Sequence, residues 1–376
     1  MIDARPYMRI LRTVALLAGI LLAACSTGGK KPAETPKDRV LRILSDHVKN
    51  GEILYGHQDD LCYGHAWKVE DWRTDSLDRS DVKSVTGKYP AILGVEIGGI
   101  EMGGKASLDS VGFGLIRKAV LTHAKRGGIV TISWHPRNPL TGGDAWDVSS
   151  DQVVKSLLEG GELHDLFMDT WLPRLGDFLE SLEGTPVIFR PWHENSASWF
   201  WWGSRLCTEQ EYKDLYRTTW TYLVKDRGLT DLLWCYSPNS GCSPDEYMAR
   251  YPGDDVIELL GLDHYAFIGP DGFGPAAERF TDELRRSLSF LYAFSVGHNK
   301  LMCLSETGLE GIPDPKWWTE VLYPAVKGFP IAYLLTWRNA CDKPTHFYAA
   351  WEGFENAPDF KAFSGLEGIV FLEPAE

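Results

Sequence analysis

The feature that most constrains the fold is a regular alternation of short apolar runs with longer amphipathic stretches. The apolar runs are 53–56, 91–95, 129–134, 187–189, 232–236, 257–262, 301–304 and 332–337. Between them, apolar residues at i, i+3 and i+4 predict helices over 114–125, 165–182, 209–225, 276–297 and 316–327. Continuous apolar strands that alternate with helices are typical of a parallel sheet buried on both faces.

Eight such strands favour an α/β fold of the (β/α)8 TIM-barrel type over an open doubly wound sheet. No glycine-rich phosphate loop opens the first helix, which weakens the nucleotide-binding alternative. With 376 residues and 44% hydrophobic content, the chain is long enough for one large barrel domain. We therefore predict a single catalytic domain over 39–376.

The N-terminal segment is predicted to be a targeting signal and not part of the fold. Three arginines precede the apolar run 14–24, which is too short to span a bilayer. Residues 22–25, Leu-Ala-Ala-Cys, resemble the lipobox of bacterial lipoproteins, so 1–24 would be the signal peptide and Cys25 the lipidated first residue. The alternative is an ordinary signal peptide with an incidental cysteine. Residues 25–38 are then a flexible tether.

Lipidation at Cys25 implies an exported lipoprotein attached peripherally to the outer membrane. No acidic cluster follows Cys25, which favours the periplasmic face over the cell surface. The six other cysteines match no zinc pattern, so neither a metal nor any other cofactor is predicted. Disulfides are permitted in an exported chain, but the sequence does not pair them. Cys235 and Cys303 lie in apolar runs and are expected to be small buried hydrophobic residues.

Charge and aromatic content restrict the class of partner. The net charge of -14 argues against nucleic acids and polyphosphates, which require a basic surface, and favours a neutral substrate. The chain has 15 Trp, 15 Tyr and 16 Phe, more than core filling alone needs. Flat amphipathic rings suit the apolar faces of sugars.

Polar and aromatic residues collect at the C-terminal ends of the predicted strands, where barrel enzymes hold their catalytic groups. In strand order they are His57, Gln58 and Asp59; Glu96; Trp134, His135 and Asn138; Arg190, His193 and Glu194; Tyr236, Ser237 and Asn239; Asp263, His264 and Tyr265; Ser305 and Glu306; and Trp337, Arg338 and Asn339. Glu194 and Glu306 follow strands four and seven, whose ends face each other across a barrel mouth. Cleavage of a neutral polysaccharide needs two such carboxylates.

The chain resembles glycoside hydrolase family 26, typified by β-mannanases, over nearly all of its length after the signal segment. The resemblance is carried by GHQDD (56–60), SWHPRNP (133–139), GGDAWD (142–147), RPWHE (190–194), WFWWG (199–203), GLDHY (261–265), SETG (305–308) and TWRN (336–339). The sequence departs from the family at Ala197, where glycine is common before the Ser-Trp pair. That departure concerns the local loop conformation and not the chemistry.

The resemblance implies that Glu194 is the acid/base and Glu306 the nucleophile. The residues implied to bind substrate are His135, Asn138, His193, Trp199, Asp263, Tyr265, Trp337 and Arg338. Within this set, Tyr265 would hydrogen-bond the nucleophile and stabilise its charged form.

Trp337 would lie under the sugar at the cleavage point, bounded by His135 and Trp199. Arg338 and Asn138 would hold sugars on the non-reducing side. Arg190, outside the implied set, is expected to be a scaffold whose guanidinium holds carboxylates in place.

The implied activity is retaining hydrolysis of β-1,4-mannosidic linkages in mannan, galactomannan, glucomannan or manno-oligosaccharides, by a monomer. Two long loops, 64–89 and 267–275, bear on whether the enzyme acts internally or releases mannobiose from chain ends. The alternatives are hydrolysis of lichenan-type β-glucan or β-1,3-xylan within the same family. A non-catalytic carbohydrate-binding protein is a further alternative, but it would not need paired carboxylates.

Overall fold

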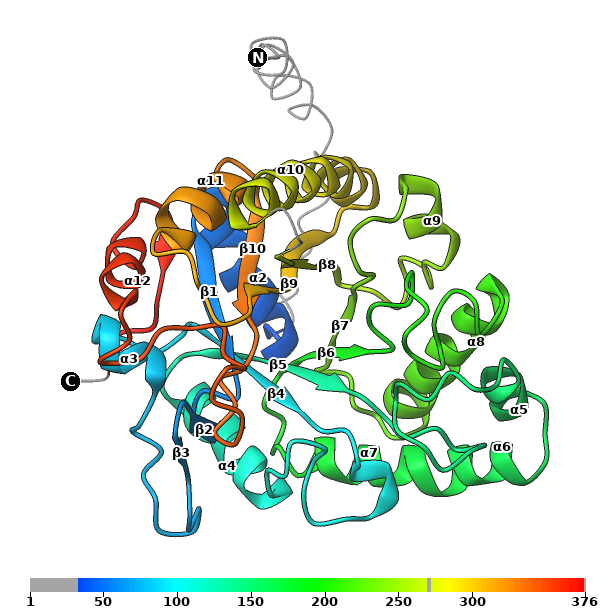
Figure 1. The fold of residues 1–376 in the computed structure, drawn as a ribbon. Coiled ribbons are helices and arrows are strands. Elements are labelled where there is room, and N and C mark those ends of the chain that lie inside the picture. The colour runs from blue at the N-terminus through cyan, green and yellow to red at the C-terminus, as the bar shows by residue number, and fades with distance from the viewer. Residues whose placement is uncertain (1–32, 269–271, 375–376) are drawn as a thin grey trace, which may run out of the picture. The chain divides into compact units, whose positions relative to one another are not determined.

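The strands form a closed parallel ring in the computed structural model, which describes residues 33–268 and 272–374 (Figure 1). The order is β10-β9-β8-β7-β6-β5-β4-β1, and β10 pairs with β1 to close the ring. The strands are β1 (Ile53–Gln58), β4 (Ile92–Glu96), β5 (Ile129–Trp134), β6 (Ile188–Pro191), β7 (Leu233–Tyr236), β8 (Leu259–Ala266), β9 (Leu301–Leu309) and β10 (Ile331–Thr336). Every predicted apolar run is a strand, and the predicted (β/α)8 barrel is confirmed.

Helices cover the outside of this ring, and each long predicted helix is present. They are α3 (Asp81–Thr86), α4 (Phe113–Lys125), α5 (Val153–Leu158), α6 (Glu162–Leu166), η2 (Phe167–Trp171), α7 (Leu172–Glu180), α8 (Glu209–Trp220), η3 (Thr221–Asp226), α9 (Pro244–Ala249), α10 (Phe273–His298), η4 (Trp317–Leu322), α11 (Tyr323–Val326) and α12 (Ala357–Phe363). Smaller elements are η1 (Ile100–Met102), the hairpin β2 (Tyr63–Gly64) and β3 (Trp67–Lys68), and β11 (Ile369–Val370), which pairs with β1. The stretch predicted as one helix over 165–182 is α6 and α7 joined by the π-helical turn η2.

The first described helix, α2 (Pro36–Lys49), begins inside the segment that was predicted to be a tether. The Thr35 hydroxyl accepts a hydrogen bond from the Asp38 amide at 3.0 Å, and Pro36 occupies the first turn, so the sequence carries a helix start. The predicted tether is therefore too long by its last three residues. The predicted signal peptide and Cys25 lie outside the described residues. Among the helices of the described chain, none combines the length and apolar character that a bilayer crossing requires.

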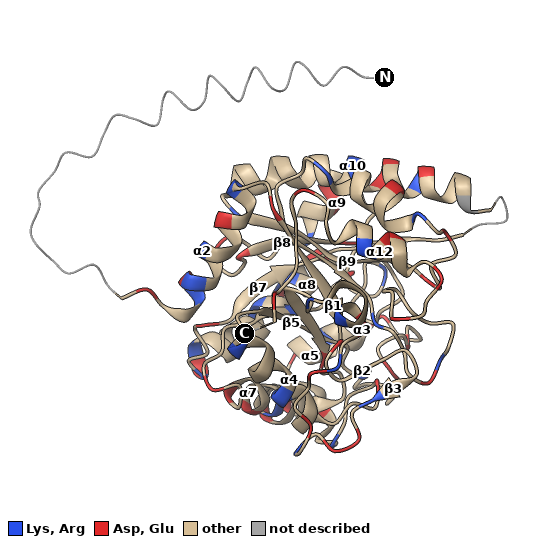
Figure 2. Ribbon diagram, turned by 90° about the vertical axis from the view of Figure 1, so that its left-hand side faces the viewer, with Lys and Arg blue, Asp and Glu red and all other residues tan. Residues whose placement is uncertain are grey.

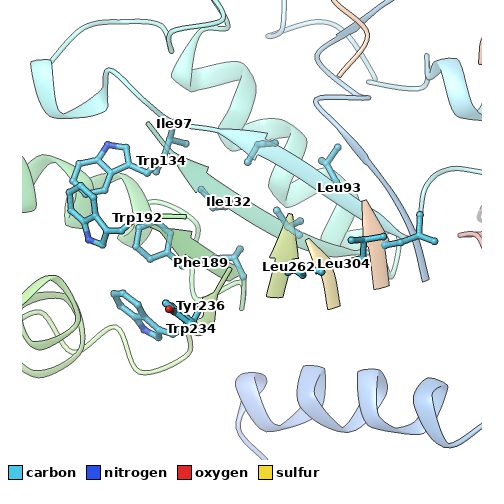
Figure 3. Close-up of a cluster of buried hydrophobic side chains, with 14 of the residues drawn as sticks. Leu93, Ile97, Ile132, Trp134, Phe189, Trp192, Trp234, Tyr236, Leu262 and Leu304 are labelled. Carbon is cyan, nitrogen blue, oxygen red and sulfur yellow. The ribbon is translucent and has the colours of Figure 1, made fainter. Parts of the chain in front are cut away.

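Two apolar layers hold the barrel together. Side chains on one face of the strands, such as Leu54, Ile92 and Cys303, form one cluster with Val40 and Leu44 of α2. The alternate residues face the surrounding helices in a second cluster, part of which is shown in Figure 3. Labelled in that view are Leu93, Ile97, Ile132, Trp134, Phe189, Trp192, Trp234, Tyr236, Leu262 and Leu304. The two-residue period of the strands thus builds both layers.

The tryptophan content mainly serves this second layer. Seven tryptophans are almost fully buried: Trp134, Trp192, Trp201, Trp202, Trp234, Trp317 and Trp318. Only Trp146 and Trp199 are exposed among the tryptophans that the structure describes. The expectation that the aromatic excess covers sugar faces is therefore wrong for most of these rings. Acidic and basic residues are interspersed along outer helices such as α10, as Figure 2 shows.

The six described cysteines are free thiols. Cys235 and Cys303 are fully buried, with their Sγ atoms 3.8 Å apart, so their predicted role as small hydrophobic residues is confirmed.

Candidate active site

Glu194 follows β6 on a sharply turned backbone. Glu194 and Trp192 have φ values of +52° and +55°, in the left-handed region that side chains other than glycine rarely adopt. The Glu194 amide donates to the Ser237 carbonyl at 2.7 Å, and the Trp202 indole donates to the His193 carbonyl at 2.8 Å. Such strain persists only where the surroundings fix it, and it concentrates at functional sites.

Glu306 lies near the end of β9, beside an irregularity in strand pairing. Leu262 pairs with Leu304, whereas the next residue, Asp263, pairs with Glu306. The extra residue in β9 is a bulge, a feature that redirects side chains. Glu306 is only 4% exposed, yet it reaches the same space as Glu194.

The distance between the two carboxylates has a direct chemical meaning. One carboxylate oxygen from each of Glu194, Asp263 and Glu306 lies within 4.8 Å of the other two. Carboxyl groups about 5–5.5 Å apart are typical of retaining glycosidases, whereas inverting enzymes leave about 6.5–9.5 Å for a water molecule. The spacing of Glu194 and Glu306 therefore suits direct attack by one carboxylate.

Two donors hold Glu306. Arg190 donates from Nη2 to Oε1 of Glu306 and from Nη1 to Oδ2 of Asp263, the latter at 2.9 Å. The Tyr265 hydroxyl donates to Oε2 of Glu306 at 2.8 Å, the contact that the family resemblance implied. Arg190 also matches the scaffold predicted from the sequence, and its charge lies between the Asp263 and Glu306 carboxylates. Both oxygens of Glu306 are thus held in position.

Glu194 is in a different electrostatic environment. Burial, together with the charge of Glu306, raises the pKa of Glu194 to about 7. The Trp199 indole donates to Oε2 of Glu194 at 2.7 Å and opposes that rise. Trp199 is 44% exposed, so it can also present its ring to a ligand. A carboxyl group that titrates near neutrality can donate a proton and take one back.

Two histidines lie against this pair. His135 and His193 are buried, and their Nε2 atoms are 2.9 Å apart. His193 Nε2 is also 3.9 Å from Oε1 of Glu306. The other ring nitrogen of His135 is 2.7 Å from Oε2 of Glu96, a carboxylate at the end of β4. Sequence reasoning noted Glu96 only as a strand-end residue and gave it no role.

Trp337 and Arg338 follow β10, which pairs with the Glu306 strand β9. The Trp337 ring centroid is 6.4 Å from that of His135, and its side chain is partly exposed. Arg338 donates to Asp109 at 2.9 Å and lies 3.4 Å from the Tyr63 hydroxyl. Arg338, Asp109 and Tyr63 border a cavity of about 410 Å³. Trp337 thus lies near His135 and Arg338 lines a cavity, while their implied contacts with sugars stay predictions.

Asn138 and Asp263 are held by contacts within the protein, and their implied contacts with substrate stay predictions. Asn138 is fully buried; its amide donates to the Asp147 carbonyl at 2.8 Å and accepts from the Leu140 amide at 3.0 Å. Asp263 is 1% exposed and is covered by Arg190 and Ser305. Asn138 organises its own loop, and Asp263 positions Arg190.

Sequence reasoning also missed Trp146. This ring is 47% exposed and stacks on His135, with centroids 5.3 Å apart and planes 13° apart. Its signal was present in the motif GGDAWD, but nothing in that motif shows which side chain points outward. Phe200, Trp201 and Trp202 of WFWWG are buried, so only Trp199 of that motif is available to a ligand.

Comparisons with known proteins identify the family of the chain. The model of glycosyl hydrolase family 26 matches residues 32–277. A mannan endo-1,4-beta-mannosidase of Bifidobacterium adolescentis is 30% identical over 347 residues, which cover 86% of this chain and 34% of that protein. A mannan endo-1,4-beta-mannosidase of Bacillus subtilis is 33% identical over 206 residues, which cover 51% of this chain and 55% of that protein.

A solved structure of a beta-mannanase from Bacteroides ovatus, assigned to the same family, is 42% identical with a TM-score of 0.83. It covers 90% of this chain and 95% of that one. The chain spans about a third of the first curated relative and about half of the Bacillus subtilis protein. The family match covers well over half of the chain, so the predicted family is confirmed. The chain belongs to glycosyl hydrolase family 26.

Proposed function

We propose that the protein is a retaining glycoside hydrolase that cleaves β-1,4-mannosidic linkages in mannan or manno-oligosaccharides. The observation that carries this proposal is the Glu194–Glu306 pair, with oxygens within 4.8 Å and with contrasting surroundings. Glu306 is held by Arg190 and Tyr265, whereas the pKa of Glu194 is raised to about 7. The names of the curated relatives support mannan as the substrate.

The proposed reaction has two steps. Glu194 donates its proton to the glycosidic oxygen while Glu306 attacks the anomeric carbon, which releases the leaving chain and forms a glycosyl ester. Glu194, now a carboxylate, takes a proton from water, and that water breaks the ester at the same carbon. Two inversions restore the original configuration, and both residues return to their starting states.

The substrate assignment is tested by one comparison of purified protein. We expect release of reducing sugar from β-1,4-mannan at a rate at least tenfold above that from lichenan or β-1,3-xylan. If lichenan or β-1,3-xylan were hydrolysed faster than mannan, the substrate assignment would change to that polymer. Binding of mannan without release of reducing sugar would favour the non-catalytic alternative.

The pH dependence of kcat/KM should report the pKa of Glu194. Because Glu194 must be protonated for the first step and its pKa is about 7, kcat/KM should fall as pH rises through about 7. Trp199 stabilises the charged form by its hydrogen bond, so Trp199→Phe should move this decline to higher pH. The pH dependence of kcat/KM measured on mannotriose, whose leaving sugar needs the Glu194 proton, would check this. A decline that stays at the same pH in the variant would contradict the role of the indole.

We further propose release of short products, with mannobiose as the main one. This secondary proposal rests on the cavity of about 410 Å³ beside Arg338, which the Arg338–Asp109 ion pair and Tyr63 border. Products from mannohexaose and from polymer should be dominated by the disaccharide from the first minutes. A ladder of mixed sizes at that stage would indicate an open cleft that cuts internally.

Cellular location follows from the lipobox-like residues 22–25, which lie outside the described part of the chain. We propose lipidation at Cys25 and attachment to the outer membrane, with the periplasmic face favoured. Protein expressed with its signal segment should fractionate with membranes, and Cys25→Ser should release it. Removal of the wild-type protein by protease added to intact cells would show that it lies on the cell surface instead.

A further inference from the structure

We propose that Glu96 is a positioning residue of the active site, which acts on the acid/base Glu194 through His135. Glu96 holds a proton on Nδ1 of His135 and keeps that ring an imidazolium. The imidazolium then places a fixed positive charge beside Glu194 and Glu306. This inference rests on the proposed function and adds a residue to its machinery.

The contacts of Glu96 are those of a buried, ionised carboxylate. Glu96 is 1% exposed and accepts from the His135 amide at 2.9 Å, from the Ser133 hydroxyl at 2.6 Å and from the Gly98 amide. Its Oε2 lies 2.7 Å from His135 Nδ1. Burial alone would raise the pKa of Glu96, but its interactions with His135 and Ser133 together lower it. A buried carboxylate needs a compensating cation, and His135 is the ion-pair partner that contacts it.

The protonation of His193 determines which histidine donates in the hydrogen bond between His135 and His193. His135 Nε2 and His193 Nε2 are 2.9 Å apart, so one of them donates. Burial lowers the pKa of His193 well below its usual value, and the neighbouring charges of His135 and Arg190 lower it further. Burial would also lower the pKa of His135, but Glu96 reverses this and raises it. His135 therefore donates and His193 accepts, with the His193 proton on Nδ1.

This arrangement has a consequence for the reaction. Because His193 Nε2 accepts from His135, it carries no proton toward Oε1 of Glu306, 3.9 Å away. Glu306 is then held by the hydrogen bonds from Arg190 and Tyr265. The His135 charge meanwhile opposes the effects of burial and of Glu306 on Glu194, and holds the pKa of Glu194 near 7. A value near neutrality lets one group serve as acid and then as base.

The charged and titratable groups that face His135 come from several elements. They are Glu96 of β4, Asp109 from the β4–α4 loop, His193 and Glu194 after β6, and Glu306 of β9. Trp146, Phe200 and Trp337 complete the surroundings with rings. Of these groups, Glu96, Glu306 and, when ionised, Glu194 favour protonation of His135 against the effect of burial. Glu96 is the one of them that contacts its ring nitrogen.

The test is Glu96→Gln, which keeps the shape of the side chain but removes its charge. His135 should lose its proton at neutral pH, and the loss of that cation should raise the pKa of Glu194. The decline of kcat/KM at high pH should then move up by about one pH unit, since a unit charge nearby has an effect of that order. Titration of histidine-selectively labelled protein by NMR should show the pKa of His135 falling in the same variant. The titration needs no turnover, so it separates failure of this inference from failure of the proposed function.

Two further variants make the test specific. His135→Gln should give the same upward shift, and adding Glu96→Gln to it should change the pH profile no further, because Glu96 acts through that ring. Glu101→Gln is the matched control: Glu101 is buried in η1, five residues after Glu96, and accepts from the Trp134 indole at 3.0 Å, and no hydrogen bond or ion pair joins it to a described histidine. It should leave the pH profile unmoved. An unmoved profile in Glu96→Gln, or a His135 that titrates as in the wild type, would overturn the proposal.

Discussion

Glu306→Ala is expected to abolish turnover of every substrate, with kcat reduced by roughly a thousandfold or more. Without this carboxylate no glycosyl ester can form, and the remaining groups, Arg190 and Tyr265, cannot attack the anomeric carbon. Azide is small enough to replace the missing side chain and should restore turnover of an activated aryl mannoside. The product should be the α-mannosyl azide, because a single displacement inverts the configuration.

The control for this experiment is Glu310→Ala. Glu310 is a nearby exposed glutamate, whose carboxylate pairs with His346 at 2.7 Å, and its loss should leave kcat within about twofold of wild type. Residual activity of Glu306→Ala above a few percent, in protein free of wild-type contamination, would remove Glu306 from the role of nucleophile.

Glu194→Ala should lose activity in a way that depends on the leaving group. In mannan and manno-oligosaccharides the leaving group is a sugar alkoxide, which departs poorly without the proton of Glu194. Their kcat/KM should therefore fall by about a thousandfold. An aryl mannoside with an acidic phenol needs no such proton, and its first step should be nearly unaffected. The second step lacks its base, so the glycosyl ester should accumulate after a burst of phenol.

Mass spectrometry of the stalled protein should show one added mannosyl unit, carried on Glu306. Azide should accelerate the second step and give the β-mannosyl azide, opposite in configuration to the product from Glu306→Ala. Equal losses on mannan and on the aryl mannoside would exclude Glu194 as the acid/base.

The barrel and the location of its active site could be predicted from the sequence because both follow from periodicity. A buried parallel strand must be apolar throughout, as in Ile129–Trp134, so its end marks the point where side chains become free for chemistry. Glu194 and Glu306 stand at such ends, and any closed eight-stranded ring brings the fourth and seventh ends into one mouth. The π-helical turns, by contrast, leave no signal in a pattern of apolar residues.

The direction of individual side chains could not be predicted in the same way. Asn138 and Trp146 belong to one loop, and both are polar or amphipathic, yet Asn138 is fully buried and Trp146 is 47% exposed. Which of them turns inward depends on backbone groups such as the Asp147 carbonyl, whose position only the folded loop defines. The same holds for Glu96, whose importance depends on a contact with His135 across two strands.

The stereochemistry of the first product tests the central claim, that Glu194 and Glu306 act by double displacement. Proton NMR spectra recorded within the first minutes of hydrolysis of mannotetraose would show which anomer forms before mutarotation. With the carboxylate oxygens within 4.8 Å, the β-anomer should appear first and the α-anomer only later. Initial formation of the α-anomer would mean single displacement by water and would contradict the roles proposed for both residues.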